Sequence, residues 1–202
     1  MKKFVPIVLA LCMVFTMSVT AFAAEVDTDG GSGSAPVYLS STEDGSIDGV
    51  PAATAMSVTV PTALPIAMSQ AGDVTTADNC RIINHSYGAV RVKSVTITAA
   101  NGWSLTAFGD KSTLAGEKVD SDKLGFAISI GGGQQAATDA SDASAQMLIS
   151  TPIDGCYMSG IGNPAGSSVA VDYSAIVTPL SAPVTNANIA DVVFVIEWDT
   201  AA

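Results

Sequence analysis

The sequence predicts an all-β protein, built as a single antiparallel β-sandwich domain. After the N-terminal region, apolar residues recur with a period of two in several short runs, separated by turns rich in Gly, Pro and Asn. Regularly spaced short strands of this kind are typical of sandwiches. No window in this part carries an i, i+3, i+4, i+7 apolar stripe long enough to predict a helix.

Residues 1–23 have the three parts of a secretory signal peptide. Lys2 and Lys3 form a positive start, residues 4–17 are apolar, and the sequence AFA at 21–23 is a small-x-small cleavage site. We therefore expect the mature chain to be exported, as a secreted, extracellular or cell-surface protein with no membrane span after cleavage.

Residues 24–52 are predicted to form a flexible acidic spacer ahead of the sandwich at 53–202. The spacer is rich in Gly and Ser, and residues 25–51 carry six carboxylates without a basic side chain. Such a composition offers too little apolar surface to offset the entropy of ordering the chain. Only residues 37–39, Val-Tyr-Leu, favour one short strand.

The first predicted strands lie between residues 56 and 84. Pro61 and Pro65 interrupt the alternating run at 56–68, which predicts an edge strand or a strand break. The run at 80–84 ends in the turn NHSYG, where Asn84 and Ser86 are expected to bond backbone groups through their side chains.

The run at 89–99 keeps its period but changes phase, because Val90 and Val92 alternate out of step with Val95 and Ile97. A β-bulge near residues 93–94 would reconcile the two halves. Asn-Gly at 101–102 is a tight-turn dipeptide, so the sequence predicts a hairpin between 95–100 and 103–108.

Four more strands are predicted, at 124–130, 145–150, 168–178 and 190–200, with a loop over 131–144. The strand at 168–178 alternates most clearly, with Val171 and Tyr173 on one face. The last is apolar on both faces. Strands of that kind are usually central or covered on both sides.

Charge and cysteine content narrow the possible partners. Signal cleavage removes two of eight basic residues, leaving six against 19 acidic residues and a net charge of −13. That charge argues against binding to nucleic acid. Cys80 and Cys156 remain in the mature chain, and export permits a disulfide between them. Two buried free thiols are the equally open alternative.

The residue types of known catalytic and metal sites are thinly represented, and no cofactor is predicted. The single histidine, His85, lies in a turn, where a solvated or hydrogen-bonding role is the usual one. The carboxylate pairs are interpreted as solvated loop charges; they are Asp120 with Asp122, and Asp139 with Asp142. Calcium is the only metal with candidate ligands, at Asp110, Glu117, Asp120 and Asp122. We therefore predict a protein that is not an enzyme.

The stretch VRVKSVTITAANGWSLTA resembles the first Trp-x-Leu motif of the WxL-type cell-surface domains of Gram-positive bacteria. The matching residues are Trp103, Ser104 and Leu105, and the expected second motif is Trp198-Asp199-Thr200, with Thr in place of Leu. The resemblance implies non-covalent association with peptidoglycan or other surface proteins, and no catalysis. From their strand positions alone, Trp103 and Trp198 are interpreted as core anchors.

Three functions follow as hypotheses. The first is a non-enzymatic cell-surface or cell-wall-associated module for adhesion or wall binding. The second is self-assembly as a structural subunit of a surface fibre, in which residues 25–55 add as a strand to a neighbouring sheet. The third, less favoured because aromatics make up only 6% of the chain, is a secreted carbohydrate-binding protein or enzyme.

Overall fold

The structure is a computed structural model, and it describes residues 55–200. The predicted signal peptide, the whole predicted spacer and the strand at 37–39 lie outside the described residues. Within them, the elements in order are β1 (Val58–Thr59), β2 (Ile66–Met68), β3 (Val74–Thr76), β4 (Arg81–Asn84), β5 (Val90–Ala99), β6 (Ser104–Leu105), α1 (Ser112–Ala115), β7 (Lys123–Ile130), β8 (Ala136–Ala137), β9 (Ala145–Ile149), β10 (Tyr157–Met158), η1 (Pro164–Gly166), β11 (Ser168–Val177) and β12 (Ala190–Trp198).

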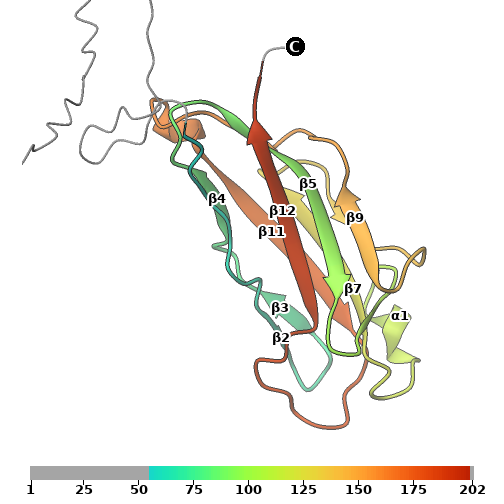
Figure 1. The fold of residues 1–202 in the computed structure, drawn as a ribbon. Helices are drawn as coiled ribbons and strands as arrows, with labels where there is room; N and C mark the ends of the chain where they lie inside the picture. Colours follow the sequence, from blue (N-terminus) through green and yellow to red (C-terminus); the bar gives the residue numbers. More distant parts are fainter. Residues whose placement is uncertain (1–54, 201–202) are drawn as a thin grey trace, which may run out of the picture. The chain divides into compact units, whose positions relative to one another are not determined.

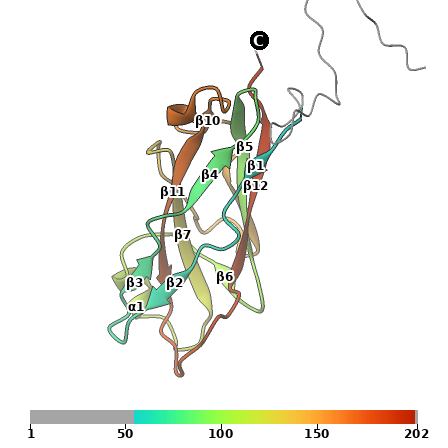
Figure 2. The same cartoon turned by 90° about the vertical axis from the view of Figure 1, so that its left-hand side faces the viewer.

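Two main sheets face each other, as the all-β prediction required (Figures 1 and 2). The first has the order β1-β4-β11-β7-β6, with β8 also paired to β7. The second has the order β10-β5-β12, with β9 on the same edge of β5 as β10. A separate hairpin, β2-β3, packs beside β11. Every strand pair is antiparallel except β6 with β7.

The core lies between the facing strands. Alternate residues of β5, β7 and β11 supply most of it, and each of these strands has a buried row on its inner side. The rings of Phe126 and Tyr173 stack with centroids 6.0 Å apart. The period-two pattern of the sequence is therefore the pattern of burial, because successive side chains of a strand point to opposite faces. The buried core residues of these strands include Val90, Val92, Val95, Ile97, Leu124, Phe126, Ile128, Ile130, Val171 and Tyr173.

The predicted bulge is confirmed at Lys93. Val195 of β12 pairs with Ser94 and the next residue, Ile196, pairs with Val92, so Lys93 is the extra residue on β5. The insertion turns both halves of β5 inward, and Val92 and Val95 are both fully buried. The extra residue explains why the apolar positions of β5 change phase between Val92 and Val95.

The predicted hairpin across Asn101-Gly102 is wrong, although the turn itself forms. Asn101 and Gly102 both have positive φ, and Trp103 N donates to Ala100 O. The chain then crosses to the first sheet, where β6 pairs with β7. β5 has no free edge for β6 at this end, because β12 pairs with Ala99 and Ala99 N donates to Ser144 O on the other side.

The expectation that the last strand is central or covered on both sides is also not met among the described residues. β12 lies at the edge of the second sheet, with β5 as its one neighbour among the described strands. Its inner row packs against the core, whereas Val193 and Val195 on the outer face are 53% and 42% exposed. The apolar outer face of β12 was interpreted as covered. In the structure, no other described strand packs on this face, so it is exposed.

Two short elements form where the sequence predicted only loops. One turn of helix, α1, forms within the 110–123 loop, and the two-residue strand β8 forms within the predicted loop at 131–144. Among residues 55–200 there is no helix of the length and apolarity needed to cross a membrane.

Candidate functional site

A groove opens between the two sheets on the side where β12 forms the edge. One wall is the segment 61–66 that joins β1 to β2, and the other is the beginning of β12 with the loop before it. Pro61 and Pro65 remove two backbone donors from this segment, so it cannot continue β1 as a strand. The chain instead runs across the open side of the sandwich, and the cavity between the walls has a volume of about 460 Å³.

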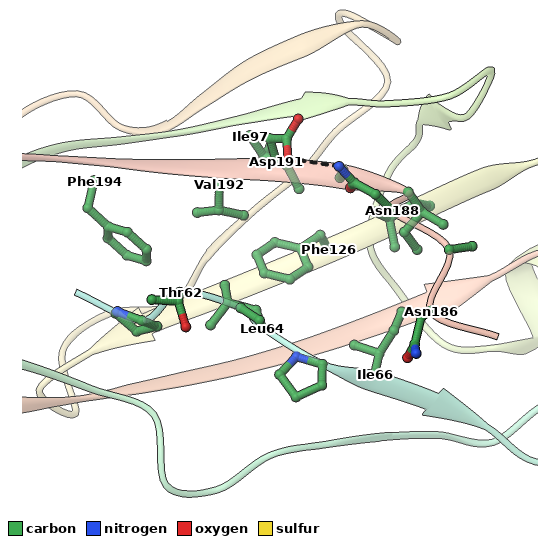
Figure 3. Close-up of a pocket in the computed structure, with 17 residues that line it drawn as sticks. Thr62, Leu64, Ile66, Ile97, Phe126, Asn186, Asn188, Asp191, Val192 and Phe194 are labelled. Atoms are coloured by element: carbon green, nitrogen blue, oxygen red, sulfur yellow. Dashed lines mark hydrogen bonds between the residues drawn. The ribbon is translucent and has the colours of Figure 1, made fainter.

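The groove has an apolar interior and a polar end. In Figure 3, Val192 and Phe194 reach from β12 toward the segment that carries Thr62 and Leu64, with Phe126 of β7 at the floor. The polar end holds the amides of Asn186 and Asn188, and Asn188 Nδ2 donates at 3.1 Å to Asp191 Oδ1, an exposed carboxylate at the rim on the outer side of β12. This lining suits an apolar or extended polypeptide segment.

Tyr173 holds one wall of the groove in place. Its hydroxyl donates to Pro65 O at 2.6 Å and accepts from Ala77 N at 3.2 Å, so it ties both ends of the β2-β3 hairpin to β11. Burial raises the pKa of the Tyr173 hydroxyl above its ordinary value. The neutral phenol is the form that donates this bond.

Replacing Tyr173 by Phe is expected to lower the free energy of unfolding by about 1–2 kcal/mol, because the two partly buried hydrogen bonds of its hydroxyl, to Pro65 O and from Ala77 N, are lost. A group with a raised folded-state pKa binds its proton more tightly when folded, so its stabilisation is present at neutral pH and is lost as pH rises above about 10. Urea unfolding at pH 7 and pH 10.5 measures both effects. An equal alkaline loss in wild type and Tyr173→Phe would contradict this role.

The two tryptophan positions lie at opposite ends of the β5–β12 ladder. Trp198 is paired with Val90 at the start of β5, whereas Trp103 follows the turn beyond the end of β5. Both side chains are half-buried and pack against the core, and Leu105 is buried with its N–H bonded to Ala143 O. The interpretation of both as core anchors agrees with this packing. The structure does not bring them into one site.

A glycine far away in sequence accommodates Trp198. A Cβ at Gly88 would lie 3.0 Å from Cζ3 of the Trp198 ring, so the indole packs directly on the glycine backbone. Sequence reasoning placed Gly88 in a turn and missed this contact.

Cys80 and Cys156 are both free thiols in the structure. Cys80 O accepts a bond from Val171 N in the first sheet, and Cys156 O accepts one from Val92 N in the second sheet. The two residues thus belong to opposite layers. Cys156 is fully buried, and this burial raises the pKa of its thiol.

Three of the four carboxylates that were interpreted as solvated loop charges accept hydrogen bonds from serine residues. Asp139 and Asp142 accept hydrogen bonds from Ser141 and Ser144, which lower the pKa of each carboxyl. Asp120 likewise accepts from Ser181, which lowers its pKa. The contacts of Asp139 and Asp142 are turn-stabilising bonds of the kind that aspartate makes locally, whereas Asp120 joins its loop to a segment 61 residues further along the chain.

The remaining calcium candidates are not gathered into one site. Glu117 forms an ion pair with Lys123 at 2.8 Å. Across residues 55–200, no three His, Cys, Asp or Glu side chains lie close enough together to hold a metal ion. His85 is exposed and its Nε2 lies 3.0 Å from Thr59 Oγ1, the hydrogen-bonding role expected of it.

Comparison with known proteins identified no relative. No family model matches the chain, and neither the curated proteins nor the solved structures contain a significant match.

Proposed function

We propose that this chain is an exported, non-enzymatic module of the cell surface that associates with the cell wall. The observation that carries the proposal is Trp103, which begins a Trp-x-Leu motif directly after a tight turn and keeps part of its indole exposed. Leu105, two residues on, is buried and fixes the strand. An aromatic ring held in this way offers a stacking surface at one end of the domain.

The use of the acidic side chains supports a binding role over a catalytic one. A general acid or base needs a pKa near the working pH. Asp120, Asp139 and Asp142 instead have pKa values lowered by hydrogen bonds from neighbouring serines. These three carboxylates therefore stay ionised at neutral pH, and their hydrogen bonds stabilise loops.

The mature chain, residues 24–202, is expected to co-sediment with purified Gram-positive peptidoglycan. Trp103→Ala should reduce the bound fraction at least severalfold, because the exposed part of the indole is removed. Trp198→Ala is the matched control, since it removes a half-buried tryptophan from the opposite end of the β5–β12 ladder. Thermal unfolding of both variants separates lost binding from lost folding.

Two results would reject the proposal. One is sedimentation no greater than that of an unrelated sandwich domain of similar charge. The other is an equal loss of binding in the two variants, which would place the contact elsewhere than at Trp103.

A further inference from the structure

β12 presents an unpaired backbone edge. Ile189 O accepts from Ala100 N and Asp199 N donates to Ala89 O, so the odd-numbered residues of this stretch exchange hydrogen bonds with β5. In an antiparallel ladder the bonding direction alternates along the strand. The N–H and C=O groups of the even-numbered residues 190–198 therefore point away from β5, where the described residues provide no further strand.

Apart from the charged Asp191 and Glu197 near its two ends, this edge lacks the features that usually protect an edge strand. Residues 190–198 contain no proline and no lysine, and the bulge in the ladder belongs to β5, so β12 itself stays regular. Its outer face carries the exposed Val193 and Val195. Edges that are long, regular and apolar invite pairing with another chain.

We propose that two copies of this chain associate through their β12 edges, antiparallel and related by a two-fold axis at Phe194. In this register Val192 stands opposite Ile196 of the second copy, and the two Phe194 residues stand opposite each other. All of these are even-numbered, so each pair exchanges its free backbone bonds. The proposal is independent of the wall-binding function.

The side chains on the outer face are self-complementary in this register. Val193 lies opposite Val195 of the second copy, and the reverse pair forms on the other side of the axis. Both valines are exposed in the single chain, and apolar pairs directly across an antiparallel ladder are stabilising. A two-fold contact needs this reciprocity, because the same patch serves both partners.

Charge is also compatible with a second copy. Asp191 lies opposite Glu197 of the second copy, and Glu197 is held by two cations, with Arg91 Nε at 2.8 Å and Lys93 Nζ at 3.0 Å. Arg91 also contacts Asp199 Oδ1 at 3.4 Å, so these four side chains carry no net charge, and Asp191 does not face an unpaired carboxylate. The Lys93 side chain is 55% exposed and is free to reach the incoming carboxylate.

The same contact would also cover apolar side chains that line the groove. Val192 and Phe194 line it from β12 and remain partly exposed there (Figure 3). In the proposed register, Phe194 and Ile196 of the second copy come in beside them. The pairing thus covers apolar surface on both faces of the sheet as well as satisfying the edge.

The test compares two double variants at exposed positions. Val193→Lys with Val195→Lys places like charges in both cross-strand pairs, whereas Val193→Lys with Val195→Glu places opposite charges there. We expect wild type to show concentration-dependent dimers in analytical ultracentrifugation, the Lys/Lys variant to dimerise at least about tenfold more weakly, and the Lys/Glu variant to keep the dimer. Met147→Lys, exposed on β9 of the same sheet, is the matched control and should leave dimerisation unchanged.

Crosslinking checks the register without depending on those variants. In a Cys80→Ser background, a mixture of Val193→Cys and Val195→Cys chains should form disulfide-linked heterodimers in preference to either homodimer, because only the mixed pair is directly opposed. Circular dichroism confirms that each variant is folded.

Several outcomes would overturn the proposal. A wild-type protein that stays monomeric up to millimolar concentration lacks the contact. Dimers unaffected by the Lys/Lys pair, or crosslinks with no preference for the mixed pair, use another surface. Assemblies that grow beyond two copies and disappear when residues 25–55 are deleted would assign the edge to a donated N-terminal strand and support a fibre subunit instead.

Discussion

Replacing Asn84 by Ala is expected to lower the free energy of unfolding by about 2–4 kcal/mol. The Asn84 side chain is 1% exposed and makes three hydrogen bonds to backbone groups. Its Nδ2 donates to Gly88 O at 2.9 Å and to Ser159 O at 3.0 Å, and its Oδ1 accepts from Ser86 N at 2.8 Å. Alanine leaves these groups unpaired in a buried place, at a cost of about 1–3 kcal/mol for each group that water cannot reach.

Urea unfolding of the mature chain measures this effect, and Asn79→Ala is the matched control. Asn79 lies five residues earlier and its side chain is exposed, so the change there should stay within about 0.5 kcal/mol. Similar losses for the two variants would show that the buried network around Asn84 contributes little.

The second large effect is expected for Gly160→Ala, with a loss of about 2–4 kcal/mol. A Cβ at Gly160 would lie 1.8 Å from Tyr87 O and 2.6 Å from Tyr87 C. Because the obstacle is backbone, relief requires the 84–88 loop to move away from the 159–161 segment. That movement would also break the bonds from Ile161 N to Ser86 O and from Asn84 Nδ2 to Ser159 O.

Gly162→Ala provides the control two residues along the chain. A Cβ at Gly162 meets no atom within 4 Å, and its φ is not positive. Differential scanning calorimetry should therefore show a large drop in the unfolding temperature for Gly160→Ala and little change for Gly162→Ala. Equal melting temperatures for the two variants would contradict the close approach of the two loops.

The all-β prediction succeeded because it rested on local patterns. Alternation in β11 maps onto a buried and an exposed face at residues 171–175, whereas β7 is covered on both faces, and the phase change in β5 locates the bulge at Lys93. Asn84 and Ser86 do bond backbone groups through their side chains, as predicted: Asn84 Oδ1 accepts from Ser86 N within the turn, whereas Ser86 Oγ donates to Ser57 O, 29 residues away. The sequence did not reveal that Asn84 also reaches Ser159.

Predictions about pairing failed where they depended on distant parts of the chain. The Asn101-Gly102 turn forms, but the partner of β6 is decided by β9 and β12, which already occupy both edges of β5. In the same way, the apolar pattern of β12 shows that its side chains can be buried on both faces, but it does not show which strands pack beside it. The groove could not be predicted from the sequence, because its two walls, residues 61–66 and 186–194, are at least 120 residues apart in the chain.

Because Trp198 packs on Gly88, substitutions at these two positions, 110 residues apart, are expected to depend on each other. A larger residue at position 88 has room only if the ring at 198 becomes smaller or turns away. Related chains that carry the second tryptophan should therefore keep glycine at the equivalent of Gly88, and chains that lose one should be free to change the other.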